Sequence, residues 1–95
     1  MVSDFVEDIL SNPKLKQKIR VLYSYNLKDM PNSKKVRFVY LLKGRKAEKG
    51  LVEVFKGEYI SSSSFIIPES KDKEMIEIMA LWGVSYKRRR IVLID

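Results

Sequence analysis

The sequence predicts a small α+β domain, and three features of the chain lead to this prediction. Apolar residues recur at helical spacing between Ser70 and Gly83. Short stretches rich in β-branched residues flank this segment, at 65–67 and 88–94. The length of 95 residues allows one modest hydrophobic core and is too short for two. A single domain is therefore expected over residues 1–95.

The first expected element is a short helix near the N-terminus. Ser3 has the side chain of a helix N-cap, and acidic residues follow in the first turn. The Asn12-Pro13 pair closes the segment, because proline disfavours continuation of a helix.

Two alternatives remain open for residues 13–26. In a helix that begins at Pro13, the apolar residues Leu15, Ile19 and Leu22 fall on one face. The same segment also alternates between apolar and polar residues over 19–27, which favours a strand.

The middle of the chain is expected to hold two further helices. The first covers 33–43, since Ser33 suits a helix N-cap and Gly44 a C-cap, although its apolar residues are too continuous for periodicity to decide. The second covers 47–56, where apolar residues repeat at helical spacing despite Gly50.

The remaining elements are strands and one more helix. Two short strands are expected to flank the four-serine loop 61–64. Ser70 is expected to cap the most regular helix, which ends at Gly83, and 88–94 returns as a strand.

These elements fit two α+β architectures. The preferred one is winged-helix-like, with three helices, a short two-stranded wing over 58–67, and a C-terminal helix and strand appended. The alternative is an antiparallel sheet with a long hairpin over 18–43, backed by two helices.

The composition argues against an enzyme. The chain has no cysteine and no histidine, which removes disulfides, thiolate chemistry, the usual zinc ligands and imidazole acid–base catalysis. Four carboxylates near the last helix are interpreted as a solvated face, at Glu69, Asp72, Glu74 and Glu77. No phosphate-binding glycine loop is found. We therefore expect no catalytic residue, no metal and no cofactor.

The sequence also bears on location. The first ten residues carry three acids and no base, unlike a secretory or mitochondrial leader, and no apolar run approaches the ~18 residues that span a bilayer. An intracellular protein, cytoplasmic or nucleoid-associated and without a membrane partner, is expected. The richness in lysine, glutamate and isoleucine is typical of thermophiles.

Positive charge is concentrated in one part of the chain. The net charge is +7, but residues 14–49 alone total +10, with twelve Lys and Arg against Asp29 and Glu48. A surface built only for solubility would intersperse both signs. Binding of a polyanion would relieve the repulsion, so a nucleic acid is the expected partner.

The candidate binding residues are the lysines and arginines of the central segment and of the C-terminal run. The linker before the expected helix 47–56 would place several of them at a helix N-terminus, where backbone N–H groups and the helix dipole favour phosphate. The complete set is Lys34, Lys35, Arg37, Lys43, Arg45, Lys46, Lys49, Lys87, Arg88, Arg89 and Arg90.

The C-terminal run 87–90 precedes apolar residues of a strand. Alternation along a strand sends two of these cations to each face. We expect one pair to extend the basic face of 14–49 and the other to pair with acids such as Glu58 or Glu77.

The function expected from the sequence is a non-enzymatic module that binds double-stranded DNA through its backbone, as a small regulator or an accessory subunit of a DNA-processing complex. One alternative is an adaptor that docks its basic face on an acidic protein. A second is an RNA or single-strand binder that stacks bases on aromatic rings. Those rings would be Tyr23, Tyr25, Phe38 and Tyr40.

Overall fold

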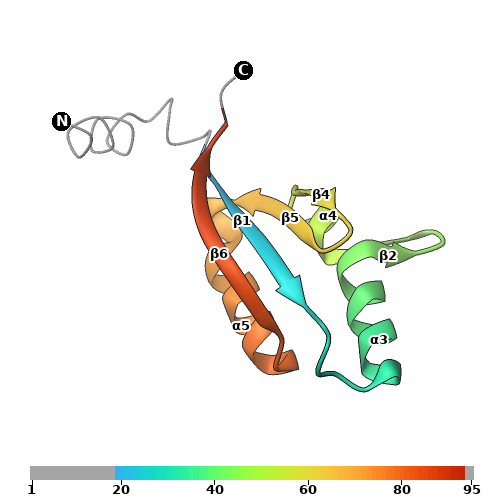
Figure 1. Cartoon of the computed structure of the whole chain (residues 1–95). Coiled ribbons are helices and arrows are strands. Elements are labelled where there is room, and N and C mark those ends of the chain that lie inside the picture. The colour runs from blue at the N-terminus through green and yellow to red at the C-terminus, as the bar shows by residue number, and fades with distance from the viewer. Residues whose placement is uncertain (1–18, 94–95) are drawn as a thin grey trace.

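The computed structural model describes residues 19–93. It shows a four-stranded antiparallel sheet with helices against one face (Figure 1). The sheet strands are β1 (Ile19–Asn26), β4 (Glu58–Ser61), β5 (Ser64–Pro68) and β6 (Ser85–Val92). The helices are α3 (Asn32–Lys43), α4 (Leu51–Val54) and α5 (Asp72–Trp82), with a 3-10 turn at Glu69–Lys71 before α5. A separate hairpin joins β2 (Gly44–Arg45) to β3 (Glu48–Lys49). The helix expected over 3–12 lies outside the described residues.

The segment with two open alternatives is a strand where it is described. In β1 the odd-numbered residues from Ile19 to Tyr25 are buried and the even-numbered ones are more exposed, which is the period of a half-buried strand. β1 pairs with β5 on one side and with β6 on the other, so its backbone groups are satisfied by both neighbours. This double pairing outweighs the helical spacing of residues 13–26.

The order of strands across the sheet is β4-β5-β1-β6, and every neighbouring pair is antiparallel. The chain goes from β1 through α3 to β4, two places away, and from β5 through α5 to β6, also two places away. Two β-α-β units are thus interleaved, which is the split β-α-β order of elements. The β2–β3 hairpin and α4 are inserted between α3 and β4, and the hairpin projects away from the sheet (Figure 1).

The core lies between the helices and the odd-numbered face of β1. The ring of Tyr23 stacks on that of Phe65 in β5, with centroids 5.2 Å apart. Phe38 of α3 contacts both Tyr25, at 5.7 Å, and Trp82 of α5, at 5.5 Å. These ring contacts tie both long helices to the same face of the sheet. No described element covers the opposite face, named here the open face.

Glycine ends the two long helices. Gly83 follows α5 with a φ of 66°, a left-handed conformation that residues with a Cβ seldom adopt, and its N–H donates to the carbonyl of Ala80. Gly44 follows α3, as the sequence predicts. Ser33 and Ser70 are not N-caps, since α3 begins at Asn32 and Ser70 lies in the 3-10 turn.

The structure corrects both expected architectures. The winged-helix order is not confirmed, because Ile19–Asn26 is a central strand and the helix expected over 47–56 is reduced to Leu51–Val54. The alternative is right about an antiparallel sheet backed by helices, but its long hairpin over 18–43 is wrong because Asn32–Lys43 is helical. The β4–β5 hairpin and the β5–α5–β6 unit are confirmed.

Truncation of a buried leucine and of an exposed one should separate core packing from helix propensity. Leu42 is fully buried, whereas Leu81 is 82% exposed. We expect Leu42→Ala to lower the free energy of unfolding by about 2–5 kcal/mol, and Leu81→Ala to change it by less than about 0.5 kcal/mol. Urea denaturation followed by circular dichroism measures both. Equal losses in the two variants would contradict this placement of the core.

Candidate nucleic-acid interface

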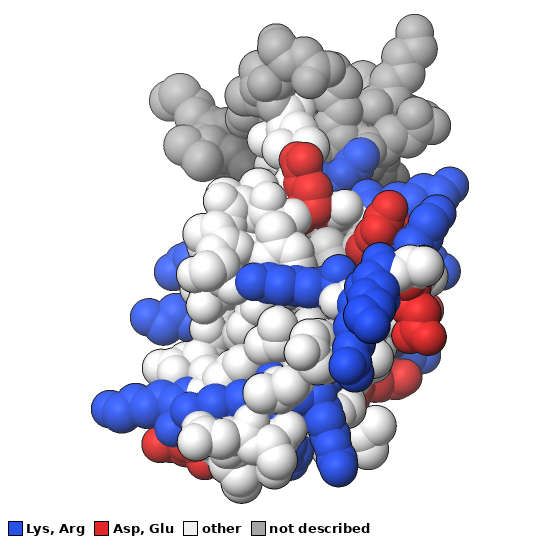
Figure 2. Space-filling view, turned by 90° about the vertical axis from the view of Figure 1, so that its right-hand side faces the viewer, with Lys and Arg blue, Asp and Glu red and all other residues white. Residues whose placement is uncertain are grey.

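Seven of the predicted binding residues lie together on α3 and on the hairpin that follows it. They are Lys34, Lys35, Arg37, Lys43, Arg45, Lys46 and Lys49, named here the α3–hairpin surface. The only acid within residues 32–49 is Glu48, so this stretch carries a net charge of +6. Figure 2 looks onto this side of the molecule, where blue side chains predominate over red ones. Seven of the twelve cations of residues 14–49 therefore lie on two adjoining elements.

Two of the cations on this surface contact aromatic rings. The Arg45 guanidinium lies over the Tyr40 ring at 5.0 Å, and the Lys43 ammonium lies over the Tyr59 ring at 4.9 Å. Among residues 19–93, no member of the α3–hairpin surface forms an ion pair. A cation held over a ring keeps its charge available to a ligand, because the ring does not neutralise it.

The expected helix N-terminus at 47–56 is absent. Glu48–Lys49 is a strand, and α4 is a single turn that begins only at Leu51. Gly50 explains the break, since a Cβ at this position would lie 2.2 Å from the carbonyl oxygen of Leu42. The close approach of the two backbones brings the chain back along α3. The linker cations therefore sit on a β-hairpin and not at a helix dipole.

The hairpin places a lysine at its tip in an uncommon conformation. Lys46 has a φ of 55°, in the left-handed region that non-glycine residues rarely occupy. The turn presents Lys46 between Arg45 and Glu48, which are paired across the hairpin. A two-stranded ribbon of this kind fits the major groove of DNA.

The four C-terminal cations divide between the two faces of the sheet, as alternation predicts. Arg88 and Arg90 lie on the helix-covered face, because they pair with Tyr23 and Val21. Arg88 forms an ion pair with Asp72, and Arg90 forms one with Glu69 at 3.2 Å. One pair of cations does bind acids, but the expected partners Glu58 and Glu77 are wrong.

Lys87 and Arg89 lie on the open face, opposite Ser24 and Leu22 of β1. Since α3 packs on the other face, these two cations do not extend the α3–hairpin surface. Of the central segment's cations, Arg20 shares the open face with them. The eleven predicted residues therefore belong to three separate locations.

Asp72 is the most buried charged residue that the structure describes, at 8% exposure. Its carboxylate accepts hydrogen bonds from the Tyr23 hydroxyl, at 2.5 Å, and from Nε of Arg88, at 2.8 Å. The hydrogen bonds from Arg88 hold the pKa of Asp72 below its usual range although burial opposes this. The hydrogen bond to Asp72 also raises the pKa of Arg88. Burial is the main cause that raises the pKa of Tyr23, and the hydrogen bond to Asp72 adds to it. This cluster fixes the first turn of α5 against β1 and β6.

The aromatic platform expected for a single-strand binder does not form. Tyr23, Tyr25 and Phe38 are buried in the core, and the Tyr25 hydroxyl lies 3.1 Å from that of Tyr59. Burial raises the pKa of both of these tyrosines. Only Tyr40 of the four predicted rings is exposed, on α3.

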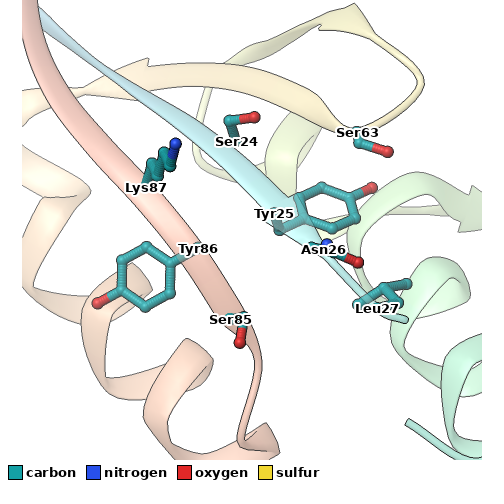
Figure 3. Close-up of a pocket in the computed structure, with 8 residues that line it drawn as sticks. All are labelled: Ser24, Tyr25, Asn26, Leu27, Ser63, Ser85, Tyr86 and Lys87. Carbon is teal, nitrogen blue, oxygen red and sulfur yellow. The ribbon is translucent and has the colours of Figure 1, made fainter. Parts of the chain in front are cut away.

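Sequence reasoning missed a hollow on the open face, which Figure 3 shows in close-up. It lies where β1 leaves the sheet and β6 enters it, next to the turn between β4 and β5. Its polar lining residues are Ser24, Asn26, Ser63, Ser85 and Lys87. These residues come from three distant segments, so only a correct strand register could have brought them together. The signal that could have located the hollow is the alternation of apolar and polar residues over 19–27, because it predicts a strand and puts Ser24 and Asn26 on one face.

Searches of protein-family models, of curated proteins and of solved structures found no match to this chain. Within residues 19–93, no helix is long and apolar enough to cross a membrane. In the same range, no group of three or more acidic residues is arranged to hold a metal ion.

The Asp72 cluster should make stability depend on pH. Because the folded pKa of Asp72 lies below its unfolded value, its contribution is present above that unfolded value, near pH 4, and is lost as pH falls through the folded pKa. At pH 7 we expect Asp72→Asn to lower the free energy of unfolding by about 1.5–3 kcal/mol, the range for hydrogen bonds to a charged group. The difference from wild type should shrink in acid.

Urea denaturation at a series of pH values measures this difference. Glu74→Gln, an exposed acid on the same helix, is the matched control and should stay close to wild type throughout. A constant deficit of the Asp72 variant at all pH values would show that its charge is not what stabilises the fold.

Proposed function

We propose that this protein is a non-enzymatic module that binds double-stranded DNA through its sugar-phosphate backbone, using the α3–hairpin surface. The observation that supports the proposal is the concentration of seven cations on one helix and one adjoining hairpin, with a single acid among them and no ion pair to any acid within residues 19–93. Phosphate contacts of this kind give affinity without sequence specificity.

The shape of the surface supports a duplex over a single strand. The hairpin projects from the body of the protein (Figure 1), and the major groove of DNA admits a two-stranded ribbon, so the proposal places the hairpin in a groove and α3 along the backbone. A single-strand binder would instead present several exposed rings for stacking, and Tyr40 is the only exposed ring on this surface. We propose that a module with this mode of binding acts as a small regulator or as an accessory subunit of a DNA-processing complex.

Salt dependence and a paired substitution test the proposal. If all seven cations contact phosphates, log K against log salt should have a slope of about −6 on duplex DNA. Arg45→Ala with Lys46→Ala should weaken binding on every sequence and reduce the steepness of the slope by about 2. Fluorescence anisotropy with labelled duplexes measures both quantities.

The matched control removes two cations elsewhere. Lys73→Ala with Arg89→Ala takes the same charge from α5 and from the open face, and it should leave the slope close to that of wild type. If both double variants lose the same affinity, binding follows net charge alone and the assignment to the α3–hairpin surface is wrong.

One observation favours a second candidate, an adaptor that docks this surface on an acidic protein. Val36 and Tyr40 are 50% and 44% exposed on α3, one turn apart and among the cations. Apolar side chains inside a charged surface are typical of protein interfaces and add little to phosphate binding.

Val36→Ser separates the two candidates because it removes apolar contact and no charge. For a DNA-binding module, the affinity for duplex DNA should change by less than about twofold, since phosphate contacts are electrostatic. For an adaptor, neither wild type nor Val36→Ser should show saturable binding to duplex DNA at 150 mM salt. The comparison of wild type and Val36→Ser in one anisotropy series decides between them.

A further inference from the structure

The hollow on the open face has the size of a small-molecule site. Its volume is about 610 Å³, within the range of about 300–1,000 Å³ that ligand pockets occupy. Leu27 supplies an apolar side chain to the lining, whereas the rings of Tyr25 and Tyr86 lie on the helix-covered face, against Phe38 and Tyr23. A bare inorganic anion would fill only a fraction of this space.

The strand register brings the polar groups of the hollow into two adjacent rows. In the first, Ser24 of β1 lies between Lys87 of β6 and Ser64 of β5. In the second, Asn26 lies opposite Ser85. Successive rows on one face lie about 6.5–7 Å apart along a strand, so the side chains of Lys87 and Asn26 have to converge from two rows on one ligand group. In Figure 3 the Lys87 side chain extends toward Ser24 from the neighbouring strand.

Hydrogen bonds within the protein use the acceptors of this cluster and leave its donors free. Oδ1 of Asn26 accepts the backbone N–H of Lys28 at 2.8 Å, which leaves the side-chain NH₂ of Asn26 to donate. Ser24 Oγ accepts the Ser64 hydroxyl at 3.3 Å, so the Ser24 proton is also available. The hollow therefore presents a hydroxyl donor, an amide donor and the ammonium of Lys87.

The charge of the hollow is uncompensated. No Asp or Glu lines it, and Lys87 forms no ion pair within residues 19–93, unlike its neighbours Arg88 and Arg90. Arg89, in the next row on the same face, adds to the positive potential. Several donors and one cation without a carboxylate suit a tetrahedral oxyanion, because its oxygens accept from each of them.

We propose that this hollow binds the phosphate group of a phosphomonoester of mononucleotide size, with Lys87, Asn26 and Ser24 as its ligands. Leu27 contacts the organic part of the molecule. The site is on the opposite face of the sheet from α3, so it does not depend on DNA binding by the α3–hairpin surface.

Titration of the ¹⁵N-labelled full chain with adenosine 5′-monophosphate tests the proposal. Saturable amide shifts are expected at residues 24–27 and 85–87, and inorganic phosphate should compete for the same site. Lys87→Met should weaken binding about tenfold or more, as expected for loss of a charge-assisted hydrogen bond, and Lys87→Arg should retain most of it. The unfolding midpoint of each variant confirms that it is folded.

Two controls make the result specific. Lys73→Met removes an exposed cation from α5, and Arg45→Ala with Lys46→Ala disables the DNA surface; both should bind the nucleotide as wild type does. Adenosine should not bind. Equal binding of adenosine, unchanged binding by Lys87→Met, or no saturable shift at the hollow would overturn the proposal.

The source of the phosphate is resolved by a pair of short oligonucleotides, one with a 5′-phosphate and one with a 5′-hydroxyl. If the phosphorylated strand shifts the same amides and the hydroxylated strand does not, the ligand is the end of a nucleic acid. If the mononucleotide alone does so, the ligand is a free nucleotide. Either result supports a phosphomonoester site.

Discussion

The pairing of β1 on both of its edges is the constraint on which the rest of the structure depends. β1 is the only strand that contacts both β5 and β6, and its odd-numbered side chains form the floor on which α3 and α5 pack. Once this register is set, every residue of β6 is assigned to one face or the other. Arg88 must then face α5, and Lys87 must face away from it.

That assignment gives the cations different chemical roles. Beside α5, Arg88 lies next to a nearly buried carboxylate, and the two charges with the Tyr23 hydroxyl satisfy one another. On the open face, Lys87 lies among hydroxyls and an amide and has no described anion to neutralise it. On α3 and the hairpin, Lys43 and Arg45 lie over the rings of Tyr59 and Tyr40. Neighbouring cations of the run 87–90 thus have different surroundings: Arg88 pairs with an acid, and Lys87 faces the hollow.

Several elements were predictable because their signals are local. Gly44 and Gly83 end helices, the apolar spacing after Ser70 gives α5, and the serine run holds a hairpin turn at 62–63, between the paired Ser61 and Ser64. The prediction of a helix over 47–56 was wrong because Gly50 packs against the backbone at Leu42. The hydrophobic periodicity of the segment carries no information on this contact. Of the candidate site, the seven cations of α3 and the hairpin came together because they are close in sequence. The separation of Lys87 and Arg89 from them required the sheet.

The sequence by itself determined the α+β class, the concentration of positive charge in the central segment and the alternation of the four terminal cations, because each depends on residue types and on spacing along the chain. Only the tertiary structure decided that 19–26 is a strand, that Asp72 and Glu69 are the acids paired with Arg88 and Arg90, and that three distant segments enclose the hollow. These outcomes depend on which strands become neighbours. Strand pairing over long separations is set by the joint burial of many side chains and not by any one segment.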